Sequence, residues 1–342
     1  MGGNALSYTT VRLTKKNYTR MAADCVAKLR ALYPNNRIEA LGSYRSKADF
    51  GDCDILVEGG DPYDPHVAAS ALNAVEVVRN GPVTSIGVIV HPDVPEKNGN
   101  VFQVDLIKME SEAFDFAMGY FGHGDTGNLL GRLYHACGLA LRHDGLFYYV
   151  RDGVNGDYKF REIALTRKFE DALPFMGYDP EVFARGFDTQ DDVYNYVVSS
   201  VYFNPAIFLL ENRNAKSRVR DKKRAMYMQF LKFCEAHPEL PAFQYPADKK
   251  AWLPRIAEYF PGFQAEFDKA LADLAEHRAV KAKFNGEWVA QLTGLQGKEL
   301  GALMKHFKES FDTPAAMRSF LLTSSPDDIK NRVHKAQAAM RP

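Results

Sequence analysis

Two aspartates stand two residues apart in the stretch "FGDCDILV", residues 50–57. In an extended strand, residues i and i+2 leave the same face, so Asp52 and Asp54 lie together while Cys53 and Ile55 enter the opposite face. Two neighbouring carboxylates raise each other's proton affinity unless a cation compensates, and hard oxygen ligands suit Mg²⁺. The pattern predicts a divalent-metal site, whereas the simpler alternative is a pair that caps a strand end in solvent.

A third carboxylate follows the same logic. In "VFQVDLIKM", residues 101–109, Phe102, Val104 and Leu106 share one face and Asp105 points to the other. If this strand neighbours the first, Asp105 converges on the Asp52 and Asp54 pair. Three such carboxylates could hold two Mg²⁺ ions, for which Mn²⁺ could substitute, about 3.5–4 Å apart. Such a centre would activate an attacking hydroxyl and stabilise a leaving pyrophosphate.

Shortly before the aspartates, Gly42 and Ser43 could form a phosphate cradle. Glycine allows close backbone approach to a phosphate, and serine adds a hydroxyl and an amide. In the following loop, Arg45 or Lys47 could balance the charge of a triphosphate.

The whole stretch "ALGSYRSKADFGDCDILV", residues 40–57, resembles the signature of the polymerase-beta-type nucleotidyltransferases, most closely that of the family X DNA polymerases. In that family the Asp-x-Asp pair and a third aspartate on a later strand bind two metal ions. The resemblance therefore implies Asp52, Asp54 and Asp105 as the metal ligands and catalytic residues, and "FQVDLI" also resembles the family's third motif. The loop between Ser43 and Asp52 is one residue shorter than the family's.

The segment "GYFGHGDTGNLLGRLYHACGLAL", residues 119–141, is similar to the family's Tyr-Phe-Thr-Gly segment and the helix after it. This similarity implies that Tyr120 and Phe121 contact the nucleotide sugar and that Asn128 and Arg132 contact the nascent base pair. The alternatives are a helix N-cap for Asn128 and a surface helix position for Arg132.

One departure from the family falls in the same segment, because Gly122 and His123 stand where the family has Thr-Gly. His123 could touch phosphate or occupy a turn, and we favour the turn. "REIALTRKFEDALPFMGYD", residues 161–179, resembles the end of the family's thumb, so the resemblance covers residues 15–185, about half the chain.

The elements that must position these residues begin with alternating helices and strands. We expect helices over 15–33, 66–81 and 129–141, strands over 37–43, 53–60, 83–91 and 101–109, a loop over 92–100 and a β-rich patch over 145–165. After about residue 185 helical periodicity dominates, most clearly over 186–203, 215–237 and 263–284.

This order predicts an α+β fold with a central mixed β-sheet, which the resemblance identifies as a nucleotidyltransferase palm. We expect three segments: a catalytic palm over 1–115, a thumb-like nucleotide- and base-pair-contacting segment over 116–185, and an all-helical, polynucleotide-binding domain over 186–342.

A basic cluster lies in the helical half, where seven Lys or Arg residues occur between Arg213 and Arg224 against one acidic residue, Asp221. Such a cluster could follow a phosphate backbone, or it could be a solvated helix face. The nucleic-acid-binding candidates are Arg218, Arg220, Lys222, Lys223 and Arg224.

The segment "FNGEWVAQLTGLQGKELGALMKHFKE", residues 284–309, contains Gly294, Gly297 and Gly301. These glycines could expose backbone amides to an anion, but we favour close helix packing. Over about 25 residues this segment resembles the C-terminal helical segment of bacterial CCA-adding enzymes and poly(A) polymerases, which implies that the helical half holds a polynucleotide.

The composition limits the classes of protein to which this chain could belong. The 342 residues carry 43 basic and 43 acidic side chains, so net charge alone does not indicate a nucleic-acid binder. No apolar run approaches the ~20 residues of a membrane span, and the four cysteines form no Cys-x-x-Cys pair. We expect a cytoplasmic protein that makes no membrane contact, and no protein partner can be inferred.

These features together predict a nucleotidyltransferase that adds nucleotides from a (d)NTP to a DNA or RNA 3′ end, most like a family X DNA polymerase. An RNA 3′-end transferase and a transferase acting on a protein or small molecule are the alternatives. The sequence leaves open the acceptor, the sugar of the triphosphate, the use of a template and the oligomeric state.

Overall fold

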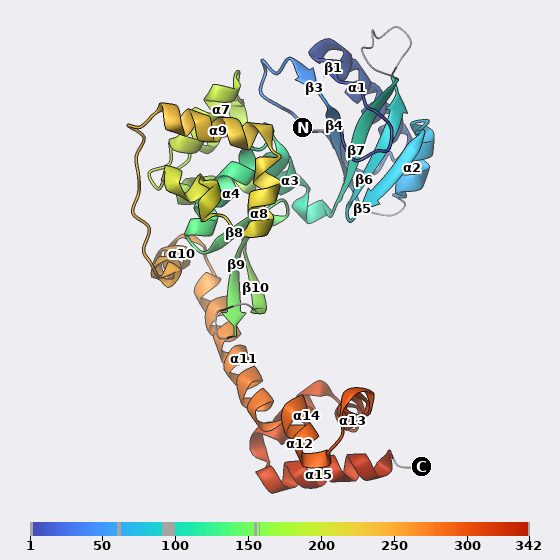
Figure 1. The fold of residues 1–342 in the computed structure, drawn as a ribbon, viewed down its shortest axis with the longest axis vertical. Helices are drawn as coiled ribbons and strands as arrows, with labels where there is room; N and C mark the ends of the chain where they lie inside the picture. Colours follow the sequence, from blue (N-terminus) through green and yellow to red (C-terminus); the bar gives the residue numbers. More distant parts are fainter. Residues whose placement is uncertain (1–2, 60–62, 91–99, 154–155, 157, 341–342) are drawn as a thin grey trace. The chain divides into compact units, whose positions relative to one another are not determined.

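The computed structural model describes residues 3–59, 63–90, 100–153, 156 and 158–340. It is an α+β fold with a central mixed sheet in the N-terminal half and helices in the C-terminal part (Figure 1), which confirms the predicted fold class. The chain forms two compact units, the first comprising residues 1–149 and 162–263 and the second comprising residues 150–161 and 264–342.

The central sheet has five strands in the order β2-β4-β7-β6-β5. Its two middle strands, β4 (Asp52–Glu58) and β7 (Val101–Met109), are parallel. The remaining pairings are antiparallel, which makes the sheet mixed. The outer strands are β2 (Ile38–Ala40), β6 (Val83–Ile89) and β5 (Glu76–Asn80). A separate two-stranded sheet joins β1 (Leu13–Thr14) and β3 (Asp49–Phe50).

Strand β4 is apolar on both faces beyond its first residues. Cys53, Ile55 and Val57 are fully buried in one core together with residues of helix α1 (Lys15–Leu32). Leu56 is buried in a second cluster that includes residues of helix α3 (Phe114–Phe121). Two-sided burial of this kind is typical of a central parallel strand, and it confines the carboxylates of β4 to the two ends of the strand.

The prediction of a helix over residues 66–81 is wrong in its second half. Helix α2 (Pro65–Ala71) ends early, Asn73 adopts a left-handed backbone with φ 53°, and the chain returns as strand β5. The branched residues of "VEVV" suit an edge strand better than a helix. Likewise α4 (Thr126–Ala136) ends before Gly138, whose φ is 84°, so the end of the predicted 129–141 helix is strand β8 (Leu139–Arg142).

The expected β-rich patch is present, residues 154, 155 and 157 lying outside the described part. Strands β8, β9 (Gly145–Asp152) and β10 (Tyr158–Thr166) form a three-stranded sheet in the order β10-β9-β8. Most of the expected loop over 92–100, and the final glycine of the strand expected over 53–60, also lie outside the described residues.

Short helices complete the first unit. They are α5 (Phe169–Ala172), α6 (Pro180–Arg185), α7 (Gln190–Val198), α8 (Ala215–Lys222), α9 (Ala225–Ala236) and α10 (Leu253–Tyr259), with 3₁₀ turns over Ser111–Ala113, Leu173–Met176, Pro205–Phe208, Leu210–Asn212 and Lys249–Trp252. The helix predicted over 215–237 is broken, because Lys223 caps the end of α8 and Arg224 the start of α9.

The second unit is mainly helical. Its helices are α11 (Phe263–Lys283), α12 (Gly286–Thr293), α13 (Gly297–Glu309), α14 (Pro314–Thr323) and α15 (Pro326–Ala339). An added Cβ at Gly294, Gly297 or Gly301 would meet nothing within 4 Å, so close helix packing does not explain these glycines. Gly294 and Gly297 instead have φ of 75° and 54°, a left-handed backbone that favours glycine.

In the described part of the chain, no helix is both long and apolar enough to cross a membrane. The cysteines are free thiols, and Cys25, Cys53 and Cys137 are buried in the apolar interior. Burial raises the pKa of Cys25 to about 11, which fits a packing role rather than a reactive one.

A buried ion pair links the residue before the N-cap of α8 to the last turn of the helix. Arg213 Nε donates to Asp221 Oδ2 at 2.8 Å, and the two side chains are 7% and 0% exposed. Arg220 Nε donates to the other carboxylate oxygen at 3.1 Å. Asp221 therefore accepts from one buried arginine, Arg213, and one exposed arginine, Arg220.

Replacing this carboxylate should be costly. We expect Asp221→Ala to lower the free energy of unfolding by about 3–5 kcal/mol, because it leaves the Arg213 charge buried without a partner. Asp327→Ala is the control, because Asp327 pairs with Lys330 while 86% exposed and should cost less than about 1 kcal/mol. Urea unfolding of both variants measures the difference, and equal losses would contradict the prediction.

Candidate active site

The three predicted carboxylates come from the two central strands. Strands β4 and β7 are adjacent and parallel, with Asp54 directly paired to Asp105 and Asp52 paired to Gln103. Adjacent strands are about 4.8 Å apart, so Asp54 and Asp105 leave the sheet side by side. Asp52 is on the same face two residues earlier, and all three aspartates are half-buried. The two strands are therefore neighbours, as convergence of the carboxylates requires.

This arrangement has an electrostatic consequence. Burial, followed by the charges of Asp52 and Asp105, raises the pKa of Asp54 to about 7. Burial also raises the pKa of Asp105, opposed by a hydrogen bond from Ser85, with smaller effects from Asp52 and Gln103. Carboxylates near one another and partly removed from water hold protons unless a cation joins them.

The donor chemistry of the aspartates fits a hard divalent cation. Three carboxylates on one face of neighbouring strands supply the oxygen ligands that Mg²⁺ prefers. As the side chains stand, the described residues contain no group of three His, Cys, Asp or Glu side chains close enough together to hold a metal ion. Mutual repulsion of like charges opposes such closure until a cation offsets it.

The predicted phosphate cradle is attached to the aspartate strand. Leu41 N donates to the backbone oxygen of Asp54 at 2.9 Å, which places Gly42 and Ser43 directly after β2 and beside the beginning of β4. An added Cβ at Gly42 would meet nothing within 4 Å, so its backbone is open to approach. The Ser43 hydroxyl is buried without a hydrogen-bond partner. Buried hydroxyls are usually paired, so Ser43 has capacity for a further acceptor or donor.

Arg45 is held by another part of the first unit, the 185–190 connector between α6 and α7. Its backbone N donates to Phe187 O at 2.9 Å, and its guanidinium pairs with Asp188 at 2.8 Å and with the carbonyl of Arg185. Ser46 N donates to Asp188 O at 2.7 Å. The backbone N–H groups of Arg45 and Ser46 and the Arg45 guanidinium are therefore already hydrogen-bonded within the chain.

Lys47 has a different environment from Arg45. Its Nζ lies 4.5 Å from the centre of the Phe50 ring. Burial lowers the pKa of Lys47, while Asp52 and Asp54 act in the opposite direction. Of the two loop cations, Lys47 is therefore the one that lies in the field of the aspartates.

The Tyr120 and Phe121 rings meet edge to face at 5.2 Å at the end of α3. An added Cβ at Gly127 would lie 2.1 Å from the Tyr120 carbonyl oxygen, so the chain passes too close here for any other residue. His123 follows in a turn with φ 58°, its ring 5.2 Å from Phe183 and 4.9 Å from Phe187. The prediction that His123 occupies a turn is confirmed.

The two residues predicted to contact a base pair have different surroundings. Asn128 is not the N-cap of α4, which is Asp125; its Oδ1 accepts from Arg220 at 3.2 Å and its Nδ2 is buried without a partner. Arg132 is only 9% exposed and donates to the Ile207 carbonyl at 2.6 Å. Burial lowers the pKa of Arg132 to about 10. The alternative of a surface position for Arg132 is therefore wrong.

Several members of the basic cluster are hydrogen-bonded within the chain. Arg218 donates to the Arg213 carbonyl at 3.0 Å, Arg220 bonds Asp221, and Arg224 pairs with Asp125. Arg218 and Arg220 are nevertheless exposed, as are Lys216, Lys222 and Lys223, whereas Arg224 is half-buried.

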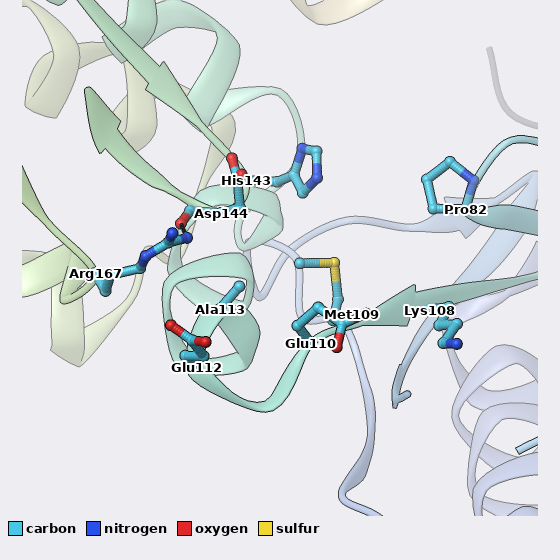
Figure 2. Close-up of a pocket in the computed structure, with 9 residues that line it drawn as sticks. All are labelled: Pro82, Lys108, Met109, Glu110, Glu112, Ala113, His143, Asp144 and Arg167. Carbon is cyan, nitrogen blue, oxygen red and sulfur yellow. Dashed lines mark hydrogen bonds between the residues drawn. The ribbon is translucent and has the colours of Figure 1, made fainter. Parts of the chain in front are cut away.

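A pocket of about 410 Å³ opens at the far end of β7. Figure 2 shows His143, Asp144 and Arg167 on one side of it and Met109 and Glu110 on another. Its lining includes none of the predicted site residues. It is therefore separate from the carboxylates and has both charge signs on its walls.

Two contributors were not foreseen from the sequence. Gln103 donates to both carboxylate oxygens of Asp105 at 3.0 Å, and Asp188 holds Arg45. Gln103 lies two residues before Asp105 on the same strand face, a spacing that could have indicated it. No local pattern indicates Asp188, which is 143 residues from Arg45.

Neither a protein-family model nor a curated protein matches this chain. The solved structures similar to it include the ternary P/T complex of Leishmania infantum polymerase beta, at 18% sequence identity and a TM-score of 0.38. That match covers 50% of this chain and 76% of the other. We therefore argue function from the residues of the site.

The raised pKa of Asp54 gives a pH test in the absence of metal. Its folded value of about 7 exceeds the unfolded value of about 3.9, so the native state retains a proton that the unfolded state has lost. Stability should therefore fall as pH rises from about 4 to 7. Asp54→Asn removes the ionisable group. Its free energy of unfolding should therefore exceed that of the wild type by roughly a few kcal/mol at pH 8.5 and equal it near pH 4.

Urea unfolding at both pH values with EDTA measures this difference. A constant difference between Asp54→Asn and wild type across that range would contradict a carboxyl group whose ionisation is opposed in the native state.

The contacts of Arg45 give a second test. Because its guanidinium is already paired with Asp188, we expect Arg45→Ala and Asp188→Ala to act alike, by loosening the loop. Each should raise the KM for a nucleoside triphosphate about two- to fivefold, the range an exposed ion pair supports, and the double variant should be no worse.

Steady-state kinetics of the wild type, the two single variants and the double variant form a double-mutant cycle. Asp191→Ala on α7 is the control. A lower KM in Asp188→Ala, alongside a higher KM in Arg45→Ala, would instead mean that Arg45 binds the triphosphate once released.

Proposed function

We propose that this chain is a Mg²⁺-dependent nucleotidyltransferase that adds nucleotides from a (d)NTP to the 3′-hydroxyl of a polynucleotide. The observation that supports this most is the direct pairing of Asp54 with Asp105 across parallel strands, with Asp52 on the same face. The cradle of Gly42 and Ser43, attached to the Asp54 carbonyl, supports a phosphate substrate beside these carboxylates.

In the proposed reaction the 3′-oxygen attacks the α-phosphorus, the bond to pyrophosphate breaks, and the hydroxyl loses its proton. Asp52, Asp54 and Asp105 would hold Mg²⁺, which supplies charge stabilisation to the attacking and leaving oxygens. Asp105 orients the hydroxyl. Ser43 and the Gly42 backbone hold the triphosphate, and Lys47 contributes positive charge next to the carboxylates.

The remaining predicted residues belong to the same proposal. Tyr120 and Phe121 would contact the nucleotide sugar, and Asn128 would reach the nascent base pair through its unpaired Nδ2. Lys222 and Lys223, two exposed members of the basic cluster, would follow a phosphate backbone. The expected segments 1–115, 116–185 and 186–342 then supply catalysis, nucleotide contacts and polynucleotide binding, respectively.

Extension assays test the proposal. A labelled DNA primer, with and without template, and an RNA lacking its 3′ end would be incubated with each dNTP and NTP separately, with Mg²⁺ or Mn²⁺. We expect incorporation that Asp105→Asn lowers by at least about 1,000-fold, because removing one ligand removes charge stabilisation in the transition state. Asp115→Asn, at a 73% exposed side chain paired with Arg37, is the matched control.

The pattern of products separates the alternatives. Template-matched dNTP incorporation supports a family X-like polymerase, and selective CTP and ATP addition to RNA supports a 3′-end transferase. Absence of extension on every polynucleotide would reject the proposal in favour of a protein or small-molecule acceptor.

A further inference from the structure

The Asp105 carboxylate has a neighbour whose own orientation is fixed. Gln103 is 3% exposed, and its Nε2 lies 3.0 Å from both Asp105 oxygens. Its Oε1 accepts a hydrogen bond of 2.9 Å from the backbone N of Ala5. The amide is thus hydrogen-bonded at both ends.

The Ala5 bond determines which end of the amide faces the carboxylate. A backbone N–H can only donate, so it selects the amide oxygen, and the NH₂ group must then point to Asp105. The flipped amide would set its oxygen against a carboxylate and its NH₂ group against an N–H. Both contacts would be repulsive, so one orientation is strongly favoured.

Ala5 belongs to an N-terminal strap, residues 3–10, which has several attachments. Thr10 Oγ1 donates to Gly3 O at 2.6 Å, and Ser7 N donates to the Glu76 carboxylate at 3.0 Å. An added Cβ at Gly3 would lie 2.5 Å from the Gly51 carbonyl oxygen. The strap therefore passes against the residue that immediately precedes Asp52.

We propose that Gln103, oriented by the Ala5 N–H, is a positioning residue that holds the Asp105 carboxylate for a divalent cation, and that the strap is part of the active-site architecture. The inference deepens the proposed function and rests on it. A neutral amide suits this role, because it restrains the carboxylate without the positive charge that would compete with the cation.

The test removes each of the two hydrogen bonds with matched variants. Gln103→Met keeps the length of the side chain without its amide. Ala5→Pro removes the donor, because proline lacks a backbone N–H. Ser7→Pro makes the same change in the same strap but removes the bond to Glu76 instead, so it is the control.

Binding of Mn²⁺ to the protein alone, measured from the EPR signal of free Mn²⁺, is the first readout. We expect affinity to fall about 10- to 100-fold in Gln103→Met, the range for loss of a group that orients a ligand, and to fall also in Ala5→Pro. Ser7→Pro should stay within about twofold of wild type. In extension assays kcat should fall with the triphosphate KM unchanged, since the cradle is intact.

Thermal unfolding checks that each variant is folded. If Gln103→Met does not fold, the Mn²⁺ affinity of Ala5→Pro tests the inference instead. Wild-type Mn²⁺ affinity in a folded Gln103→Met, or equal effects of Ala5→Pro and Ser7→Pro, would overturn the inference. A wild-type protein that extends no polynucleotide would reject the proposed function, while the Mn²⁺ titration would still decide whether Gln103 positions Asp105.

Discussion

The parallel pairing of β4 with β7 is the constraint on which the site depends. Backbone hydrogen bonds and two-sided burial fix the register that sets Asp54 beside Asp105. The fold therefore forces like charges together, and burial followed by these charges raises the pKa of Asp54. The groups around them follow from the same constraint: the cradle begins at the Asp54 carbonyl, and Gln103 projects from the same strand as Asp105.

The sequence predicted the parts of this arrangement that depend on local pattern. The strands that hold the aspartates are short apolar runs rich in branched residues, and β4 and β7 lie where expected. Strand β5 was missed because "AVEVV" follows a genuine helix and Asn73 was not recognised as the turn residue between them, and β5 is extended through its pairing with β6. The glycines of α12 and α13 were misinterpreted because spacing cannot distinguish a packing role from a backbone requirement.

Hydrogen-bond partners that are far apart in the sequence could not be predicted from local sequence patterns. The bonds of Arg45 to the 185–190 connector and of Arg132 to Ile207 join residues 143 and 75 positions apart. From the sequence, a basic side chain in a loop or on a helix is expected to be available to bind phosphate. In the fold, however, Arg45 and Arg132 are both hydrogen-bonded to other parts of the chain. Within the basic cluster the same applies to Arg218, Arg220 and Arg224, so a count of positive charges overstates the surface that a polynucleotide could contact.

The strap also affects the order in which the site forms during synthesis. Ala5 and its acceptor Gln103 on strand β7 are 98 residues apart. A ribosome adding about 5–20 residues per second completes that interval in roughly 5–20 seconds. Until then the Ala5 N–H has no Gln103 side chain to orient, and Asp52 and Asp54 lack the third carboxylate, Asp105. Cation affinity should therefore arise in one step, when β7 joins the sheet, rather than accumulating as each ligand is made.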